Sequence, residues 1–248
     1  MHRALESPRP LVFAHRGGSK IGPENTIAAF DRGLAAGADG LELDVHLSRD
    51  GVVVVHHDRQ LDRTTRLTGP IAARTAGELA EVDVPALRDV LARYSRTRLI
   101  IEMKEPGAAL ANAVVGEVHR AGAADHICLG SFSVTALRAA RAAAPEIATS
   151  AGRFEVRMAL YRSWVHLSPG RVPYQAMQVP ETSGRTRVIS PRFVALAHRA
   201  GLVVHVWTVD APGDIRRLLE WGVDGIISDR PDIAADIVHR RSAIVDRR

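Results

Sequence analysis

Short apolar runs alternate with longer amphipathic stretches along almost the whole chain. The short runs are rich in Val, Ile and Leu and end at turn residues or charged side chains, which is typical of buried strands. The longer stretches repeat apolar residues every three or four positions, as helices that pack on a core do. This pattern predicts an α/β protein with eight strands, at residues 11–15, 40–45, 98–104, 127–132, 146–150, 174–179, 202–209 and 225–228.

Helix start and stop signals place a helix between consecutive strands. Asn25 or Thr26 can cap the first helix and Gly37 ends it, while Pro191 stands at the first position of a later one. Eight such strand–helix units in 248 residues favour a (β/α)8 TIM barrel over an open doubly wound sheet, which could hold similar elements. The remaining helices are predicted at residues 85–94, 108–120, 134–143, 155–164, 191–200, 212–221 and 233–241.

The alternation is interrupted after the second strand. Residues 46–84 contain one β-branched run, preceded by the turn-forming pair Asp50-Gly51, and are otherwise mostly polar. We therefore expect a small insertion at 46–84 within a single domain that spans residues 11–241. Residues 1–10 are expected to be a mobile leader, and residues 242–248 a tail.

Composition and charge narrow the classes of partner. The net charge is +5 and the pI is about 10.1, but the arginines are spread along the chain and aromatic residues are only 4%, so we expect no nucleic-acid partner. The single cysteine excludes an intrachain disulfide. The start lacks a signal peptide's apolar run and no stretch is long enough to span a membrane, so we expect a cytoplasmic protein without stable membrane insertion. The oligomeric state is not predicted.

Carboxylates stand at strand ends, where a packed core would normally exclude them. Glu42 and Asp44 share one face of the second strand, because alternate residues of a strand point to the same side, and Glu102 lies near the end of the third strand. Two carboxylates at this spacing repel each other unless a proton or a cation lies between them. Oxygen-rich sites of this kind suit Mg²⁺ or Ca²⁺. We therefore expect one divalent cation at these three residues.

Basic residues occupy the same predicted rim. Arg16 could hold a phosphate through its planar guanidinium, and Lys104, one of only two lysines in the chain, could do so as a compact charge. His15 and His57 are candidates for the acid and the base at a phosphorus centre. Asp58 could orient His57, although adjacent side chains in an extended segment point apart. Together these residues predict a metal-assisted phosphate site at the carboxyl ends of the strands.

The order and spacing of several short motifs are more specific than any one of them. They are His15-Arg16-Gly17, Pro23-Glu24-Asn25-Thr26, residues 37–45, His57-Asp58, Arg63-Thr64-Thr65, Glu102-Met103-Lys104, residues 206–210 and residues 222–231. Because it carries these motifs in this order, the chain resembles the glycerophosphodiester phosphodiesterase family over about residues 11–236. The resemblance implies a TIM-type barrel with a small insertion after the second strand. It also implies hydrolysis of a small-molecule glycerophosphodiester to sn-glycerol 3-phosphate and an alcohol.

The resemblance also implies roles for the candidate residues. The three carboxylates are expected to bind the divalent cation, Mg²⁺ or Ca²⁺. His15 and His57 are expected to carry out acid–base catalysis, and Arg16 and Lys104 to contact the phosphate. The usual mechanism for the family is attack of the glycerol 2-hydroxyl on phosphorus, followed by opening of the cyclic phosphate by water.

Four residues are expected to support or border the site. Glu24, Asn25 and Asp58 are expected to support the residues that contact the ligand without contacting it themselves. Trp207 is expected either to pack beneath the rim or to form an apolar wall for the substrate. Residues 151–188 match the family poorly, so the alcohol group of the substrate is not predicted.

Two other functions compete with this interpretation. A lysophospholipase D-like phosphodiesterase would use the same histidines on acylated lipids, but the low aromatic content and the lack of an evident apolar loop argue against it. A non-catalytic phosphate- or metal-binding barrel would not need both His15 and His57.

Overall fold

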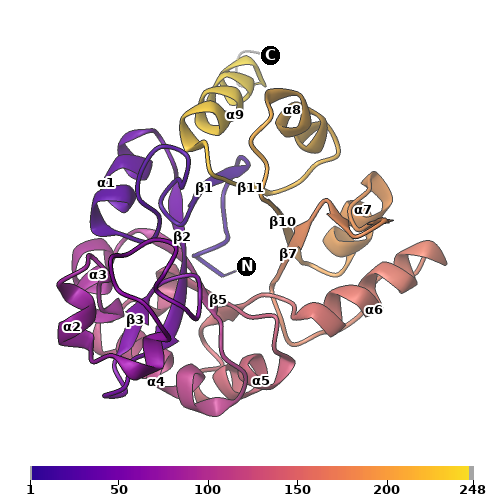
Figure 1. Cartoon of the computed structure of the whole chain (residues 1–248). Coiled ribbons are helices and arrows are strands. Elements are labelled where there is room, and N and C mark those ends of the chain that lie inside the picture. The colour runs from indigo at the N-terminus through magenta and orange to yellow at the C-terminus, as the bar shows by residue number, and fades with distance from the viewer. Residues whose placement is uncertain (1, 246–248) are drawn as a thin grey trace.

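A computed structural model describes residues 2–245, and the side chains of residues 2–241. Its eight parallel barrel strands are β1 (Leu11–His15), β2 (Gly40–Leu47), β4 (Arg98–Met103), β5 (Ile127–Gly130), β6 (Ala148–Thr149), β7 (Ala176–Pro180), β10 (Val203–Trp207) and β11 (Gly225–Ser228). Neighbouring strands follow the order β6-β5-β4-β2-β1-β11-β10-β7. A bridge between Ser150 and Ala176 joins the segments that follow β6 and begin β7. The predicted barrel is confirmed (Figure 1).

Helices surround the barrel on the outside (Figure 1). They are α1 (Ile27–Ala35), α3 (Leu87–Tyr94), α4 (Ala108–Arg120), α5 (Val134–Ala143), α6 (Arg153–Trp164), α7 (Pro191–Arg199), α8 (Pro212–Glu220) and α9 (Pro231–Val245). The last helix is longer than predicted, so residues 242–245 of the expected tail belong to α9. Residues 246–248 of that tail lie outside the described residues.

Side chains that point into the barrel form an apolar plug beneath the site. Leu11 and Phe13 from β1, Ile100 from β4 and Val203 from β10 belong to one buried cluster. Because side chains alternate along a strand, the next inward positions of β1 and β4 are His15 and Glu102. The same alternation that fills the barrel therefore turns the ionisable strand ends toward one another.

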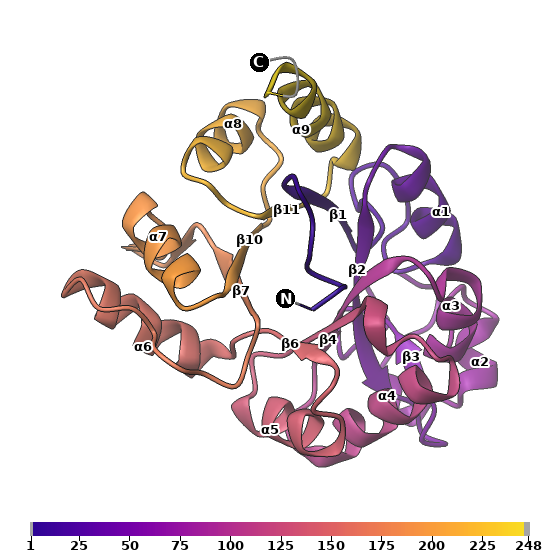
Figure 2. The ribbon, with the colours of Figure 1, turned by 180° about the vertical axis from the view of Figure 1, so that it is seen from behind.

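The N-terminal segment closes the opposite end of the barrel (Figure 2). We expected a mobile leader, but Ala4 and Leu5 are 2% and 3% exposed and pack in the cluster that includes Leu11 and Phe13. Arg98 also donates a hydrogen bond to the carbonyl oxygen of Glu6. The apolar side chains of this segment thus find partners far away in sequence.

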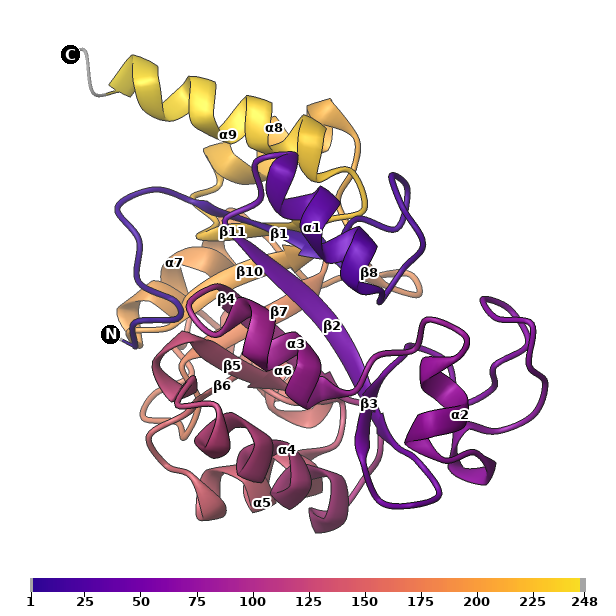
Figure 3. The same cartoon turned by 90° about the vertical axis from the view of Figure 1, so that its left-hand side faces the viewer.

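The predicted insertion contains β3 (Val53–Val55), the 3-10 helix η1 (Ile71–Ala73) and α2 (Ala76–Ala80). It projects from the end of β2 (Figure 3), and β3 pairs antiparallel with β2. Its side chains form a small buried cluster of their own, made of Val54, Leu61, Ile71, Leu79 and Val84. The insertion thus has an apolar core of its own, and the β2–β3 pair is one of its attachments to the barrel.

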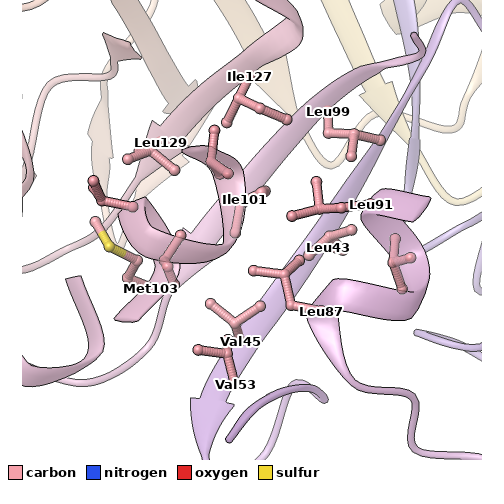
Figure 4. Packing of buried hydrophobic residues seen from close by; sticks show 14 of the residues in the cluster. Leu43, Val45, Val53, Leu87, Leu91, Leu99, Ile101, Met103, Ile127 and Leu129 are labelled. Atoms are coloured by element: carbon pink, nitrogen blue, oxygen red, sulfur yellow. The ribbon is translucent and has the colours of Figure 1, made fainter. Parts of the chain in front are cut away.

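The largest buried cluster lies between β2, β4 and β5 and the helices outside them (Figure 4). Leu43 and Val45 of β2 and Ile101 of β4 point outward, where Leu87 and Leu91 of α3 belong to the same cluster. These outward residues alternate with the inward acids. The packing of α3 and α4 therefore fixes the strands that carry the site.

Two features outside the insertion were not predicted from the sequence. A two-stranded hairpin, β8 (Thr182–Ser183) and β9 (Thr186–Arg187), lies in the stretch where the family motifs match poorly. The 3-10 helix η2 (Ala124–His126) precedes β5. Among the described residues, no helix combines the length and apolar character needed to cross a bilayer.

Gly33 lies where α1 packs closely on the loop after β1. A Cβ at this position would lie 2.7 Å from the carbonyl oxygen of Gly17 and 2.8 Å from the Cβ of Ala14. We expect Gly33→Ala to lower the free energy of unfolding by about 1–3 kcal/mol, because neither neighbour can move without shifting backbone. Gly213→Ala in α8 is the matched control, since no described atom would come within 4 Å of its Cβ. Urea titrations of both variants test this, and an unchanged midpoint for Gly33→Ala would contradict it.

Candidate active site

Three carboxylates meet at the carboxyl end of the barrel strands. Glu42 and Asp44 come from β2 and Glu102 from β4, and one oxygen atom of each lies within 4.8 Å of the others. The strand register explains this, because Asp44 lies directly beside Glu102. Glu42 and Asp44 are 4% and 1% exposed. The cluster that the sequence predicted is thus assembled inside the barrel.

The three acids cannot all ionise easily without further positive charge. Burial and the charge of Asp44 raise the pKa of Glu42 to about 8. Burial also raises the pKa of Glu102, against the opposing charge of Lys104. Burial would raise the pKa of Asp44 as well, but Lys104 and His57 hold it below its usual value. A divalent cation among these oxygens would let all three carboxylates ionise, and an all-oxygen donor set fits a hard cation such as Mg²⁺ or Ca²⁺.

Two cationic side chains border the carboxylates. Lys104 Nζ lies 3.1 Å from Asp44 Oδ1 and 3.4 Å from Glu102 Oε1. Arg16 Nε lies 3.3 Å from Asp44 Oδ2, and its Nη1 donates to Glu24 Oε1 at 3.1 Å. Both cationic side chains are mostly buried yet line the same pocket. Their place beside the carboxylates is suitable for binding phosphate oxygens.

Asn25 fixes one carboxylate from behind. It has a positive φ of 59°, is 2% exposed, and donates from Nδ2 to Asp44 Oδ2 at 3.0 Å. Of the two candidate caps, Thr26 is the one that caps α1, since its hydroxyl accepts from the backbone N–H of Ala29. Asn25 is therefore left to orient Asp44, in agreement with its predicted supporting position.

Each candidate histidine is paired with an aspartate. His15 Nδ1 lies 2.6 Å from Asp229 Oδ1, and His57 Nδ1 lies 2.6 Å from Asp58 Oδ1. Because an ionised carboxylate can only accept, Nδ1 of each ring donates, and Nε2 remains as the nitrogen for proton transfer. His15 Nε2 lies 3.8 Å from Glu42 Oε2, which directs it toward the carboxylate cluster.

The two histidines have pKa values shifted in opposite directions. Burial acts to lower the pKa of His15, but the contacts with Asp229 and Glu42 outweigh it and the net shift is upward. Burial lowers the pKa of His57, and the opposing charge of Asp44 does not reverse this. Two rings with different proton affinities in one pocket are suited to act as an acid and a base.

Arg63 ties the insertion to the barrel through the supporting acids. It donates from Nε to Asp58 Oδ2 at 2.6 Å and from Nη1 to Glu24 Oε2 at 2.9 Å. Burial would raise the pKa of Asp58, but Arg63 and His57 lower it to about 2. The argument that Asp58 and His57 must point apart was wrong, because residues 57–59 form a bend and not an extended strand.

The candidate histidines, carboxylates and cationic side chains line one pocket, which has an aromatic wall on one side. Trp207 at the end of β10 meets Phe132 edge to face, with ring centroids 5.9 Å apart. Trp207 borders the pocket and also packs against the buried cluster beneath it, so its two predicted positions are compatible. The predicted residues that line the pocket are His15, Arg16, Glu42, Asp44, His57, Glu102, Lys104 and Trp207.

Comparison with known proteins identifies the family of this chain. Residues 15–233 match the model of the glycerophosphoryl diester phosphodiesterase family. The chain belongs to this family. A glycerophosphodiester phosphodiesterase from Caldanaerobacter subterraneus is 31% identical over 252 residues, covering 94% of this chain and 99% of that protein.

Solved structures with the same fold include two further phosphodiesterases. The crystal structure of a glycerophosphodiester phosphodiesterase from Agrobacterium tumefaciens has a TM-score of 0.76 and 29% identity, covering 92% of this chain and 99% of that one. An Oleispira antarctica phosphodiesterase in complex with its product sn-glycerol-3-phosphate has a TM-score of 0.75 and 24% identity, covering 93% of this chain and 97% of that one. This second likeness shows the fold alone.

Two site residues of this phosphodiesterase family member were not assigned from the sequence. Asp229, the partner of His15, directly follows β11, so the strand-end signal that selected Glu102 and Lys104 also applies to it. Arg63 belongs to a motif that carried the resemblance, yet its spacing gives no sign that it reaches Glu24, which is 39 residues away.

Asp229→Asn tests whether this aspartate positions His15. An amide keeps the shape but removes the charge that raises the pKa of His15, so we expect kcat to fall on the order of 10²-fold. The pH profile should also change, with the limb due to His15 moving to lower pH. Asp224→Asn is the matched control, since Asp224 pairs with His198 at the other end of the barrel. Equal losses in both variants would indicate a structural role only.

Proposed function

We propose that this protein hydrolyses glycerophosphodiesters to sn-glycerol 3-phosphate and an alcohol, with one divalent cation, Mg²⁺ or Ca²⁺. The observation that carries the proposal is the meeting of three carboxylates, two of them buried, with two cationic side chains and two aspartate-paired histidines at one pocket. Family membership and the product complex of the Oleispira antarctica phosphodiesterase support the substrate class. We propose Glu42, Asp44 and Glu102 as the ligands of the cation.

Charged and aromatic side chains position the substrate in this proposal. Arg16 and Lys104 bind the non-bridging phosphate oxygens, the first through its planar guanidinium and the second as a point charge. Trp207 forms an apolar wall beside the organic part of the substrate. Glu24 holds Arg16 in place through the contact at 3.1 Å.

The two histidines move the protons. One takes the proton of the glycerol 2-hydroxyl as that oxygen forms a bond to phosphorus, and the other gives a proton to the alcohol as its bond to phosphorus breaks. Water then opens the cyclic phosphate with the roles reversed, which restores both rings. A divalent cation held by the carboxylates supplies positive charge that offsets the charge developing on the reacting oxygens. The Asp229 and Asp58 contacts keep Nε2 of each ring available for these transfers.

The direct test is the release of sn-glycerol 3-phosphate by metal-stripped protein. The protein is incubated with glycerophosphocholine or glycerophosphoethanolamine, with and without Mg²⁺ or Ca²⁺, and product is read by a coupled dehydrogenase. We expect release that depends on added cation. A folded, cation-binding protein that releases nothing from a broad panel of diesters would instead support the non-catalytic barrel.

A further inference from the structure

Exposed apolar side chains gather on one helix beside the site. Helix α6 projects outward from the barrel (Figures 1 and 2). Phe154 and Trp164 on this helix are each 55% exposed, and Val165 and Leu167 just after it are 64% and 51% exposed. Every large apolar side chain of comparable exposure in the described part of the chain lies at Phe132 or within residues 154–167. Contrary to the expectation from sequence, the chain does carry an apolar segment at the rim.

Part of this helix forms one wall of a groove. Val156, Leu160 and Trp164 line it from α6, and Pro180 and Val188 line it from β7 and the segment after the β8–β9 hairpin. On α6 these positions are spaced four residues apart, so they lie on one face. Phe154 and Met158 do not line the groove. The helix thus has one apolar face toward the groove and another toward solvent.

The groove is continuous with the catalytic pocket. Four residues line both cavities: Phe132, Ala151, Gln178 and Trp207. The Phe132–Trp207 pair is therefore the border between the phosphate site and the groove. A substrate bound at the carboxylates that extends past this pair enters the groove, where Val156, Leu160 and Trp164 offer apolar surface, so the groove is placed to contact the organic part of a diester.

The charge of the groove restricts what can occupy it. Its charged lining residues are Arg153 and Arg157, and none is acidic. Arg153 lies over the ring of Phe132, with its guanidinium carbon 5.0 Å from the ring centroid. A cationic alcohol group such as choline would be repelled here, whereas a hydrocarbon chain would bury against Val156 and Leu160. The chemistry of the groove thus favours an acyl chain over a cationic head group.

We propose that this groove binds the acyl chain of single-chain glycerophospholipids, so that the protein also accepts 1-acyl glycerophosphodiesters. The inference rests on the proposed function, because the reaction is the same. The bond between phosphorus and the head-group alcohol breaks, water supplies the new oxygen on phosphorus and the proton on the alcohol, and the acyl ester stays intact. The free 2-hydroxyl of these lipids is retained, which the proposed attack on phosphorus requires.

The first test compares glycerophosphocholine with its 1-hexanoyl, 1-octanoyl and 1-decanoyl derivatives, each below its critical micelle concentration. Choline release by holoenzyme is measured in every case. We expect kcat/KM to rise by about twofold to fourfold for each added methylene, mainly through KM, since each buried methylene strengthens binding. If glycerophosphocholine is hydrolysed but chain length has no effect, this inference is wrong and the proposed function stands. If no substrate is hydrolysed, the proposed function fails as well.

The second test uses two variants of the same helix. Trp164→Ser removes a groove residue and Phe154→Ser removes an equally exposed residue outside the groove. We expect Trp164→Ser to lower kcat/KM for the decanoyl substrate about tenfold and to leave glycerophosphocholine turnover unchanged, with no effect of Phe154→Ser. The same assay is repeated with the substrate presented in lipid vesicles. If both variants then lose kcat/KM equally, and only with vesicles, α6 contacts a lipid surface and the groove proposal is overturned.

Discussion

Replacement of either candidate catalytic histidine by alanine is expected to lower kcat/KM by about 10²- to 10⁴-fold. His15 and His57 each present Nε2 to the pocket while Nδ1 is held by an aspartate. Removal of one ring leaves a proton transfer without its donor or acceptor, but it leaves the carboxylates and the two cationic residues in place. The loss should therefore appear mainly in kcat, measured by sn-glycerol 3-phosphate release.

The controls for the histidine variants separate chemistry from folding. His239→Ala changes an exposed histidine on α9 and should keep full activity. Added imidazole should restore part of the turnover of His57→Ala, because the side chain of His57 is 29% exposed and lines the pocket. If both active-site variants keep more than a tenth of the activity of the unaltered protein, the assignment of acid–base catalysis to these rings is wrong.

Glu42→Gln is expected to abolish cation-dependent turnover, with a loss of about 10³-fold, because charge stabilisation by a bound metal amounts to several kcal/mol. The glutamine keeps the volume of the buried side chain but removes one anionic ligand. Addition of Mg²⁺ or Ca²⁺ should raise the Tm of the unaltered protein and should have little effect on the Tm of the variant. Glu146→Gln, at an exposed position, should behave as the unaltered protein does. An unchanged metal-induced Tm shift in Glu42→Gln would remove Glu42 from the ligand set.

Without metal, the unaltered protein and Glu42→Gln should differ in how their stability depends on pH. The pKa of Glu42 is about 8 in the fold, above the usual value of 4.5, so the folded state holds this proton more tightly than the unfolded chain does. Stability from this group is therefore complete below about pH 4.5 and is lost as the pH rises toward 8. Glu42→Gln should lack this loss, and thermal melts of metal-free protein across that range would measure the difference.

Strand alternation and parallel order made the centre of the site predictable. Once residues 11–15, 40–45 and 98–104 are recognised as parallel strands, their carboxyl ends must meet, and His15, Glu42 and Glu102 must point inward. No side-chain contact had to be known for this. The barrel itself was predictable on the same basis, because eight repeated units leave few alternatives.

The parts that were missed depend on contacts between residues far apart in sequence. The leader was expected to be mobile because nothing local holds it, yet Ala4 and Leu5 are buried against the barrel. The pairing of His15 with Asp229 spans 214 residues, and neither residue indicates the other. Helix α6 was predicted, but its apolar residues are not confined to one face, so periodicity did not show which of them stay exposed.

The site is built on two parts of the molecule, the barrel and the insertion, which need not unfold together. The carboxylates belong to the barrel, whereas His57 and Asp58 belong to the insertion, which has its own small core around Leu61 and Ile71. Local unfolding of the insertion alone would withdraw one of the two proposed proton carriers and leave the proposed cation ligands in place. The protein would then bind metal without turning over substrate. A bound diester that touches both parts would hold the insertion closed, so substrate itself stabilises the active arrangement.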